Sequence, residues 1–221
     1  MIAIPLVVLL SLQVSSPDAA GTLPLAPVRL LQSPPPAEAD DVARLGAPSV
    51  RLETRQGVDS IWLLRTADSA FVVARMSDAS PYWGDDLVIS LDVSGDGGAV
   101  PGHDDFQWYF RRAIDSSVIY RGRGSRWEAP RGDPDWRLGG SREGGGWTVG
   151  SSDGPLGWSV VLRLDGAWLA GESGRCPRIA FRAYDDSPGG WFAWPRPDAG
   201  IQPASIERSP DRWGCVGGAA P

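Results

Sequence analysis

Short apolar runs, each followed by a turn, recur from Val50 onward and suggest the architecture of the chain. In DLVISLDV, residues 86–93, the odd-numbered positions are all apolar, whereas Ser90 and Asp92 fall on the other side. A period of two is typical of a β-strand with one face in the core. Seven further runs have strand character: residues 50–54, 60–66, 70–76, 106–112, 117–123, 158–164 and 178–185.

The connections between these runs favour hairpins. FQWYFRR and SVIYRGR are expected to pair across the turn AIDS, and a glycine-rich hairpin is expected at 138–151. GAWLAGESG, residues 166–174, reads as a short helix or turn, and long helical periodicity is absent. The 28 Gly and 20 Pro supply the turns. We therefore predict an all-β fold, an antiparallel β-sandwich of jelly-roll type.

The first 48 residues differ in composition from the rest. An apolar run from Ile2 to Val14 meets small residues at Ser15 and Ser16, and residues 1–19 read as a signal peptide. The alternative is an uncleaved anchor, because no Lys or Arg precedes the run. Residues 20–48, rich in Pro, Ala and acid, are expected to be a disordered spacer before a domain at 49–221. The prediction is an exported protein, secreted or periplasmic, without membrane contact after leader removal.

Two cysteines, Cys176 and Cys215, lie far apart in the chain. An even count in an exported protein favours a disulfide, which would fasten the C-terminal RWGCVGG to the start of PRIAFRAY. Two unpaired buried thiols are the alternative. Neither cysteine has the spacing of a metal ligand.

The net charge of the chain limits the classes of binding partner that we expect. The net charge is -6, every basic residue is Arg, and no basic run occurs, so nucleic acid is not an expected partner. Eleven Trp is a high count for 221 residues. Tryptophans fill cores, and they also form flat platforms for sugar rings.

The acidic turn after DLVISLDV is a candidate metal site. Asp92, Ser94 and Asp96 alternate before a glycine, as oxygen ligands do at the start of a calcium loop. Asp104 and Asp105 could complete the set if the hairpin folds back. His103 stands where an EF-hand has its bidentate Glu, so the loop is not an EF-hand. The alternative is a solvated turn in which Asp and Gly satisfy turn chemistry.

Loop aromatics are the candidate sugar platforms. Tyr82 and Trp83 lie in PYWGDD, and Trp191 and Trp194 lie in GGWFAWP; both segments are rich in Gly, Pro or acid. Tryptophans on predicted strands, such as Trp108, are expected to pack in the core. Candidate partners for sugar hydroxyls are Asp85, Asp86, Arg111, Asp185 and Asp186.

The order of five segments resembles a known family. They are SIWLLRTADSAFVVARMSDAS, YWGDDLVISLDVSGDGG, DDFQWYF, GWSVVLRL and RIAFRAYDD, followed by Trp194. This order is similar to that of the carbohydrate-binding module family 9-like domains, related to the DOMON sandwiches, over about 50–194. The resemblance implies a β-sandwich that binds sugars, often with structural calcium, and commonly accompanies glycoside hydrolases. WSVVLRL lacks the glutamate usual near this strand, and the family's binding tryptophans sit in loops of variable length.

Two other functions remain open beside carbohydrate binding. One is a structural or interaction domain without a sugar site. The other is haem binding, which some DOMON relatives achieve through Met and His; Met76 and His103 are the internal pair available. An enzyme is not expected, because the Asp pairs are adjacent and adjacent strand residues point to opposite faces. No nucleophile motif accompanies His103.

Overall fold

A computed structural model describes residues 23–35, 45–55, 57–78, 85–114, 116–129, 147–154, 157–170, 174–185 and 190–219. The elements in order are β1 Leu25–Leu30, β2 Val50–Glu53, β3 Val58–Arg65, β4 Ser69–Met76, β5 Asp86–Asp92, β6 Asp105–Arg111, η2 Arg112–Ile114, β7 Ser116–Arg123, β8 Arg126–Glu128, β9 Trp147–Gly154, β10 Gly157–Asp165, η3 Gly166–Leu169, β11 Arg178–Asp185, β12 Gly190–Trp194, η4 Pro203–Arg208, η5 Pro210–Arg212 and β13 Gly214–Ala219. Elements labelled η are 3₁₀ turns.

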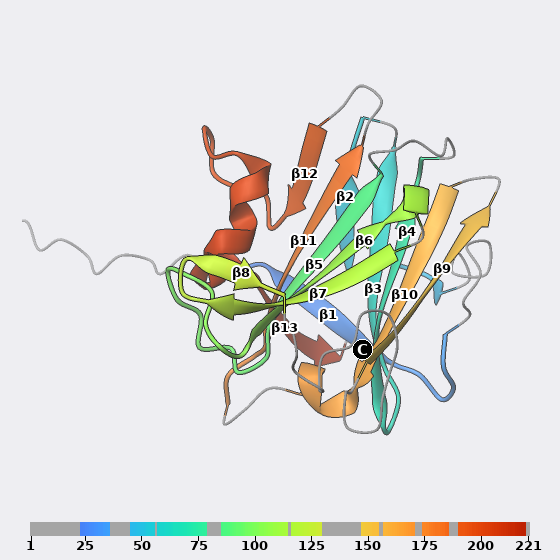
Figure 1. The fold of residues 1–221 in the computed structure, drawn as a ribbon. Helices are drawn as coiled ribbons and strands as arrows, with labels where there is room; N and C mark the ends of the chain where they lie inside the picture. Colours follow the sequence, from blue (N-terminus) through green and yellow to red (C-terminus); the bar gives the residue numbers. More distant parts are fainter. Residues whose placement is uncertain are drawn as a thin grey trace, which may run out of the picture.

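The strands form one curled sheet whose two halves pack face to face (Figure 1). Within the described residues the order is β8-β7-β6-β5-β11-β13-β1-β3-β4-β10-β9, with β12 added to β11 and β2 added to β3. Most neighbours are antiparallel, but β1 runs parallel to both β13 and β3. The all-β sandwich prediction is confirmed, with a mixed sheet in place of a purely antiparallel one.

The alternation along β5 and β6 sets the core. Leu87, Ile89 and Leu91 point between the halves of the sheet and are at most 1% exposed. Trp108 on β6 is fully buried there, and truncating such a ring to Ala typically costs about 3–5 kcal/mol. The expected pairing of FQWYFRR with SVIYRGR is confirmed as the β6–β7 ladder. Trp62 on β3 and Trp158 on β10 are also buried.

The spacer prediction needs correction at Leu25–Leu30. These residues form β1 in the middle of the sheet, with Ala26 fully buried. Farther along, Leu31 and Leu45 pack on the outer side of β3 and β4, where the Trp62 indole donates to the Gly46 carbonyl at 3.0 Å. The strand was missed because its partners are distant in sequence and its prolines suggested a spacer.

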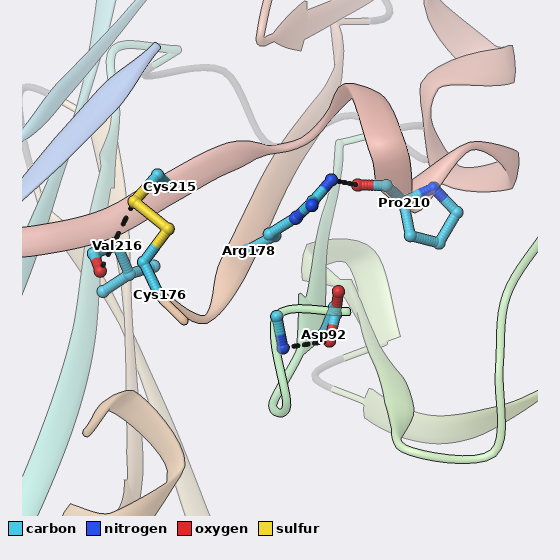
Figure 2. The surroundings of a disulfide bond; sticks show 7 residues. Asp92, Cys176, Arg178, Pro210, Cys215 and Val216 are labelled. Atoms are coloured by element: carbon cyan, nitrogen blue, oxygen red, sulfur yellow. Dashed lines mark hydrogen bonds between the residues drawn. A yellow bond between two sulfur atoms is a disulfide. The ribbon is translucent and has the colours of Figure 1, made fainter. Parts of the chain in front are cut away.

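A disulfide joins the start of β11 to its neighbouring strand β13 (Figure 2). Cys176, before β11, bonds to Cys215 on β13 across 39 positions, as predicted from the sequence. Arg178 pairs with Cys215 in the ladder, and its Nη1 donates to the Pro210 carbonyl at 3.4 Å. The C-terminal segment is therefore fastened to β11.

Other predictions concern parts of the chain outside this description. Residues 1–19, read as a leader, and most of the glycine-rich hairpin at 138–151 are among them. In the described residues, no helix has the length and apolar character needed to cross a membrane.

Candidate functional site

The face of β5, β6, β11 and β12 that points away from the core is organised in rows. At one end the ladder aligns Arg111, Asp86, Tyr184 and Trp191. Two residues farther along, Tyr109 lies opposite Val88, which lies opposite Arg182. Since side chains two apart on a strand share a face, both rows present their side chains together.

We call six of these residues the aromatic face: Asp86, Tyr109, Arg111, Arg182, Tyr184 and Trp191. The three rings are partly buried, and Tyr184 and Trp191 lie 5.0 Å apart with tilted planes. The Arg182 guanidinium carbon lies 3.8 Å from the centre of the Trp191 ring, and that of Arg111 lies 5.2 Å from the Tyr109 ring. Each arginine guanidinium thus lies over an aromatic ring.

Asp86 is the acidic centre of the aromatic face. It accepts a short hydrogen bond from the Tyr109 hydroxyl, and its other oxygen lies 3.9 Å from Arg111 Nε. Burial raises the pKa of Asp86, while the bond from Tyr109 and the charges of Arg111 and Arg182 oppose the rise. Burial and the bond to Asp86 raise the pKa of Tyr109. The hydroxyl therefore keeps its proton at neutral pH and donates the hydrogen bond to Asp86.

Glu207, from a different part of the chain, fixes side chains beneath the aromatic face. Its Oε2 accepts from Arg182 Nη2 at 2.8 Å and from Gln107 Nε2 at 3.1 Å. Gln107 also donates to Ser90 at 3.3 Å. The position of the Arg182 guanidinium over Trp191 is thereby fixed by a side chain that lies outside the sheet.

The segment that carries Glu207 is η4, which packs on β11 and β12 (Figure 1). Ile206 and Trp213 form a small apolar cluster with Ala180, and the buried Trp213 indole donates to the Ile206 carbonyl at 2.7 Å. Trp127 of β8 stacks on Trp213 with ring centres 6.3 Å apart. The C-terminal segment therefore covers the inner part of this face. In the outer row Asp86 is buried, Tyr184 and Trp191 are partly exposed, and Arg111 is exposed.

The predicted sugar-site residues separate into three groups. Arg111 and Trp191 come together on the aromatic face. Asp85 is 2% exposed and forms an ion pair with Arg112 at 3.0 Å, so its carboxylate points into the protein. Tyr82 and Trp83 lie outside the described residues.

Trp194 is turned toward the core. Its ring packs on Phe181 at 6.0 Å and lies directly over Gly214, where a Cβ would approach a ring carbon to 2.1 Å. It remains partly exposed and lines a groove together with Trp191. The two predicted tryptophans are therefore near each other but point to opposite sides of β12.

Sequence reasoning missed Tyr109, Arg182, Tyr184 and Glu207. A signal for the first three was present: in FQWYFR and RIAFRAY the polar and aromatic residues alternate with the apolar ones that enter the core. A strand whose non-core face carries Tyr and Arg is a candidate binding surface. Glu207 gave no such signal, because η4 reaches the sheet only through tertiary packing.

A second cluster lies at the opposite end of β5 and β6. We call it the carboxylate loop: Asp92, Ser94, Asp96, Asp104 and Asp105. One carboxylate oxygen from each of Asp92, Asp96 and Asp104 lies within 4.8 Å of the others. Ser94 Oγ lies 3.5 Å from Asp92 and donates a short bond to Asp104. The structure thus brings together three of the four acids that the sequence proposed as metal ligands.

Backbone donors shape the carboxylate loop. Asp92 is fully buried and accepts from the Gly95 and Gly97 N–H groups at 2.6 and 2.8 Å. Both glycines have positive φ, and a Cβ on Gly95 would lie 2.0 Å from the Cys176 carbonyl oxygen. The loop is therefore packed tightly against the disulfide segment (Figure 2).

Asp105 is the unusual member of this group. It is fully buried; Oδ2 accepts from the Gly102 N–H, while Oδ1 has no hydrogen-bond partner among the described residues. Burial, together with the charges of Asp92, Asp104 and Asp96, raises the pKa of Asp105 to about 8. Burial also raises the pKa of Asp92. An orphaned carboxylate oxygen among acids fits a hard cation, whose charge would satisfy it.

The residues considered for haem are not brought together. Met76 is 3% exposed and pairs with Trp158, over which Arg112 lies at the end of β6. His103 is exposed and precedes the start of β6. The two side chains therefore belong to opposite ends of the sandwich.

Comparison with known proteins gives a match at the level of structure. No model of a known protein family matches the chain, and no curated protein sequence matches it. Among solved structures, it is similar to a carbohydrate binding module family 9 from Caldicellulosiruptor kristjanssonii in complex with cellotriose. The TM-score is 0.55 at 16% identity, over 88% of this chain and 94% of that one. The complex with glucose gives the same score and identity over 89% and 97%.

Proposed function

We propose, from the fold shared with carbohydrate-binding module family 9, that this chain is a non-catalytic module that binds neutral carbohydrate on the aromatic face. One observation carries the proposal: Tyr109, Tyr184 and Trp191 surround hydrogen-bonding side chains of both signs on one face. A pyranose has an apolar face that stacks on such rings and hydroxyls that need donors and acceptors.

The charges on this face favour a neutral ligand. Arg111 and Arg182 are balanced by Asp86 and Glu207, each within 4 Å of an arginine. Paired charges donate and accept hydrogen bonds without attracting an ion of either sign over distance. An acidic or basic glycan would meet an opposite charge already satisfied by its neighbour.

The structural neighbours suggest the first ligands to test. The related module was solved with cellotriose and with glucose. Isothermal titration of this protein with both sugars is expected to show saturable binding that is strongly weakened in Trp191→Ala. Arg123→Ala is the control, because it removes an exposed ion pair with Glu128 outside the aromatic face. Failure of the protein to bind any member of a neutral glycan panel would leave the structural-domain alternative.

We also propose that the carboxylate loop holds a calcium ion with a structural role. Asp92, Asp96, Asp104 and Asp105 would provide carboxylate oxygens and Ser94 a hydroxyl, an all-oxygen set that suits a hard cation. The buried, unpartnered Oδ1 of Asp105 supports this assignment. When bound, calcium would supply positive charge only; the chain orients the ligands through the Gly95 and Gly97 N–H groups.

The calcium proposal has a direct measurement. Chelator-treated protein titrated with calcium is expected to release heat and to gain thermal stability, and magnesium should be less effective because it requires a tighter octahedral shell. Asp104→Asn should weaken the response, while Asp198→Asn, an exposed acid elsewhere, should leave it unchanged. Absence of both heat and thermal shift would remove the assignment.

Export is the third part of the proposal. The apolar run Ile2–Val14 supports a leader, and the Cys176–Cys215 disulfide fits an oxidising compartment. Amino-terminal sequencing of protein recovered from the cell exterior or periplasm is expected to begin after residue 16. Recovery of the intact amino terminus in a membrane fraction would favour the anchor.

A further inference from the structure

The disulfide and the carboxylate loop are neighbours in the sheet. Arg178 of β11 pairs with Asp92 on one side and with Cys215 on the other (Figure 2). Asp92 is the acid that the backbone N–H groups of the loop orient. The proposed calcium site therefore lies next to the strand that carries one end of the disulfide link.

The glycines of the carboxylate loop pack against the chain that enters β11. A Cβ on Gly95 would lie 2.0 Å from the Cys176 carbonyl oxygen. A Cβ on Gly97 would lie 2.5 Å from Arg178 Nη1. The N–H groups of the same two glycines donate to Asp92, at 2.6 and 2.8 Å. The position of the chain at Cys176 thus sets the position of the groups that orient a calcium ligand.

The C-terminal segment contacts the loop at a further point. The Asp211 N–H in η5 donates to the Gly98 carbonyl at 3.0 Å. Arg178 Nη1 donates to the carbonyl of the adjacent Pro210 at 3.4 Å. Cys215 follows four positions after Asp211, within β13. The loop, the start of β11 and the C-terminal segment therefore form one connected unit, which the disulfide closes covalently.

The noncovalent contacts between β11 and β13 are few in the described part of the chain. Their ladder spans two positions, and the Val216 N–H donates to the Pro177 carbonyl at 2.7 Å. A contact with so few hydrogen bonds opens at a low cost in free energy. β13 also pairs with β1, so the strand keeps a place in the sheet without the disulfide. Cys176 and Cys215 are both partly exposed, so a small reductant can reach them.

We propose that the Cys176–Cys215 disulfide controls the calcium affinity of the carboxylate loop, which is highest only in the oxidised protein. This inference rests on the proposed calcium site and adds its regulation. A dithiol reductant breaks the S–S bond to give two thiols and is itself oxidised to a disulfide. The loop then holds its ligand-binding arrangement for a smaller fraction of the time. The apparent dissociation constant rises in inverse proportion to that fraction.

The test is calcium titration of the full protein before and after reduction with dithiothreitol. Reduction is expected to raise the calcium dissociation constant about tenfold, with an unchanged circular dichroism spectrum. The double variant Cys176→Ser and Cys215→Ser should show the weaker affinity with or without dithiothreitol. Val73→Ala is the control for a general loss of stability, because it thins the apolar cluster on the outer side of β3 and β4. It should leave the dissociation constant unchanged.

Thermodynamic linkage gives an independent readout. If the disulfide raises calcium affinity by a given factor, calcium must favour disulfide formation by the same factor. In a dithiothreitol redox buffer, calcium that saturates both forms is expected to raise the ratio of oxidised to reduced protein about tenfold. A disulfide that only stabilises the fold would give a ratio that does not depend on calcium.

A variant with an intact disulfide tests the route of the coupling. Arg178→Met keeps a side chain of similar shape but removes the donor to the Pro210 carbonyl and the guanidinium beside Gly97. It is expected to raise the calcium dissociation constant about threefold to fivefold in the oxidised protein. Arg123→Ala, which removes an exposed ion pair on β7, is the matched arginine control.

The outcomes separate the inference from the calcium proposal. If oxidised protein shows neither heat nor a thermal shift with calcium, the calcium site itself is wrong, and the inference with it. If oxidised and reduced protein are both folded and bind calcium equally, the site stands and the redox control is wrong. If the protein unfolds without the disulfide, Arg178→Met decides. A dissociation constant within about twofold of the wild-type value would then overturn the inference.

Discussion

The two ends of β5 and β6 both gather carboxylates, but in opposite electrostatic settings. On the aromatic face, Asp86 lies beside Tyr109, Arg111 and Arg182, and these groups oppose the rise in its pKa caused by burial. In the carboxylate loop, burial raises the pKa of Asp105, and the neighbouring acids raise it further. On the aromatic face the charges of the acids and arginines balance one another, and their side chains can hydrogen-bond a ligand. In the carboxylate loop, the negative charge of the buried carboxylates destabilises the fold until a cation or a proton neutralises it.

The largest expected effect concerns Asp105 and pH. In chelator, the folded protein holds a proton on Asp105 up to about pH 8, whereas an ordinary Asp loses it near 3.8. Because the folded state binds more protons in this window, the free energy of unfolding should fall as pH rises from about 4 to about 8. Urea unfolding at a series of pH values measures this. Asp105→Asn should flatten the profile, and a wild-type profile that rises with pH would contradict the sign.

Calcium should oppose the fall in the free energy of unfolding at high pH. At a free concentration one hundred times its dissociation constant, an ion that binds only the folded state adds about 2.7 kcal/mol to the free energy of unfolding. We expect the gain at pH 8 and little gain at pH 5, where protons compete for the carboxylates. Thermal melts with calcium or chelator at both pH values measure it. Equal stabilisation at both values would show that Asp105 is not a ligand.

Removing the Trp191 ring should weaken sugar binding and leave the carboxylate loop intact. Trp191→Ala is expected to weaken binding of cellotriose by about 2 kcal/mol, the typical size for a buried aromatic contact. The calcium response should be unchanged, since Trp191 lies beside one end of the β5–β11 ladder and Asp92 lies at the other end. Calorimetry with each ligand checks both statements, and loss of both responses would indicate global unfolding.

Glu207 should act through Arg182. Glu207→Gln keeps the shape but removes the charge that pairs with Arg182 at 2.8 Å. We expect sugar affinity to fall by about 1–1.5 kcal/mol, the net contribution of one ordinary hydrogen bond. The ring of Trp191 should also report the change through its fluorescence. A fall in melting temperature with unchanged affinity would mean that Glu207 is structural only.

The smallest effect is expected at Arg111. Its side chain is 49% exposed and lies 3.9 Å from Asp86, so the ion pair should contribute at most about 0.5 kcal/mol to stability. Arg111→Ala should therefore leave the melting temperature nearly unchanged and weaken sugar binding only a few-fold. A large loss of affinity would show that Arg111 contacts the ligand directly.

Local pattern was sufficient for much of the fold. The alternation in DLVISLDV and FQWYFRR determined which side chains enter the core, because strand geometry places every second residue on one face. The acidic turn was also recognisable, because its acids lie close together in the sequence, from the end of β5 through the connection to the start of β6. The disulfide followed from an even cysteine count in a chain that the sequence predicts to be exported.

Tertiary structure decided what sequence spacing does not encode. β1 became a central strand because β13, almost the whole chain away, pairs with it. Asp85 turned inward to Arg112, while its neighbour Asp86 faces outward, a difference of one position in strand register. Glu207 reached Arg182 only through the packing of Ile206 and Trp213 on the sheet. The sequence by itself determined most of the strands and the acidic loop through local periodicity, and non-local packing placed β1 and decided which polar side chains share a surface.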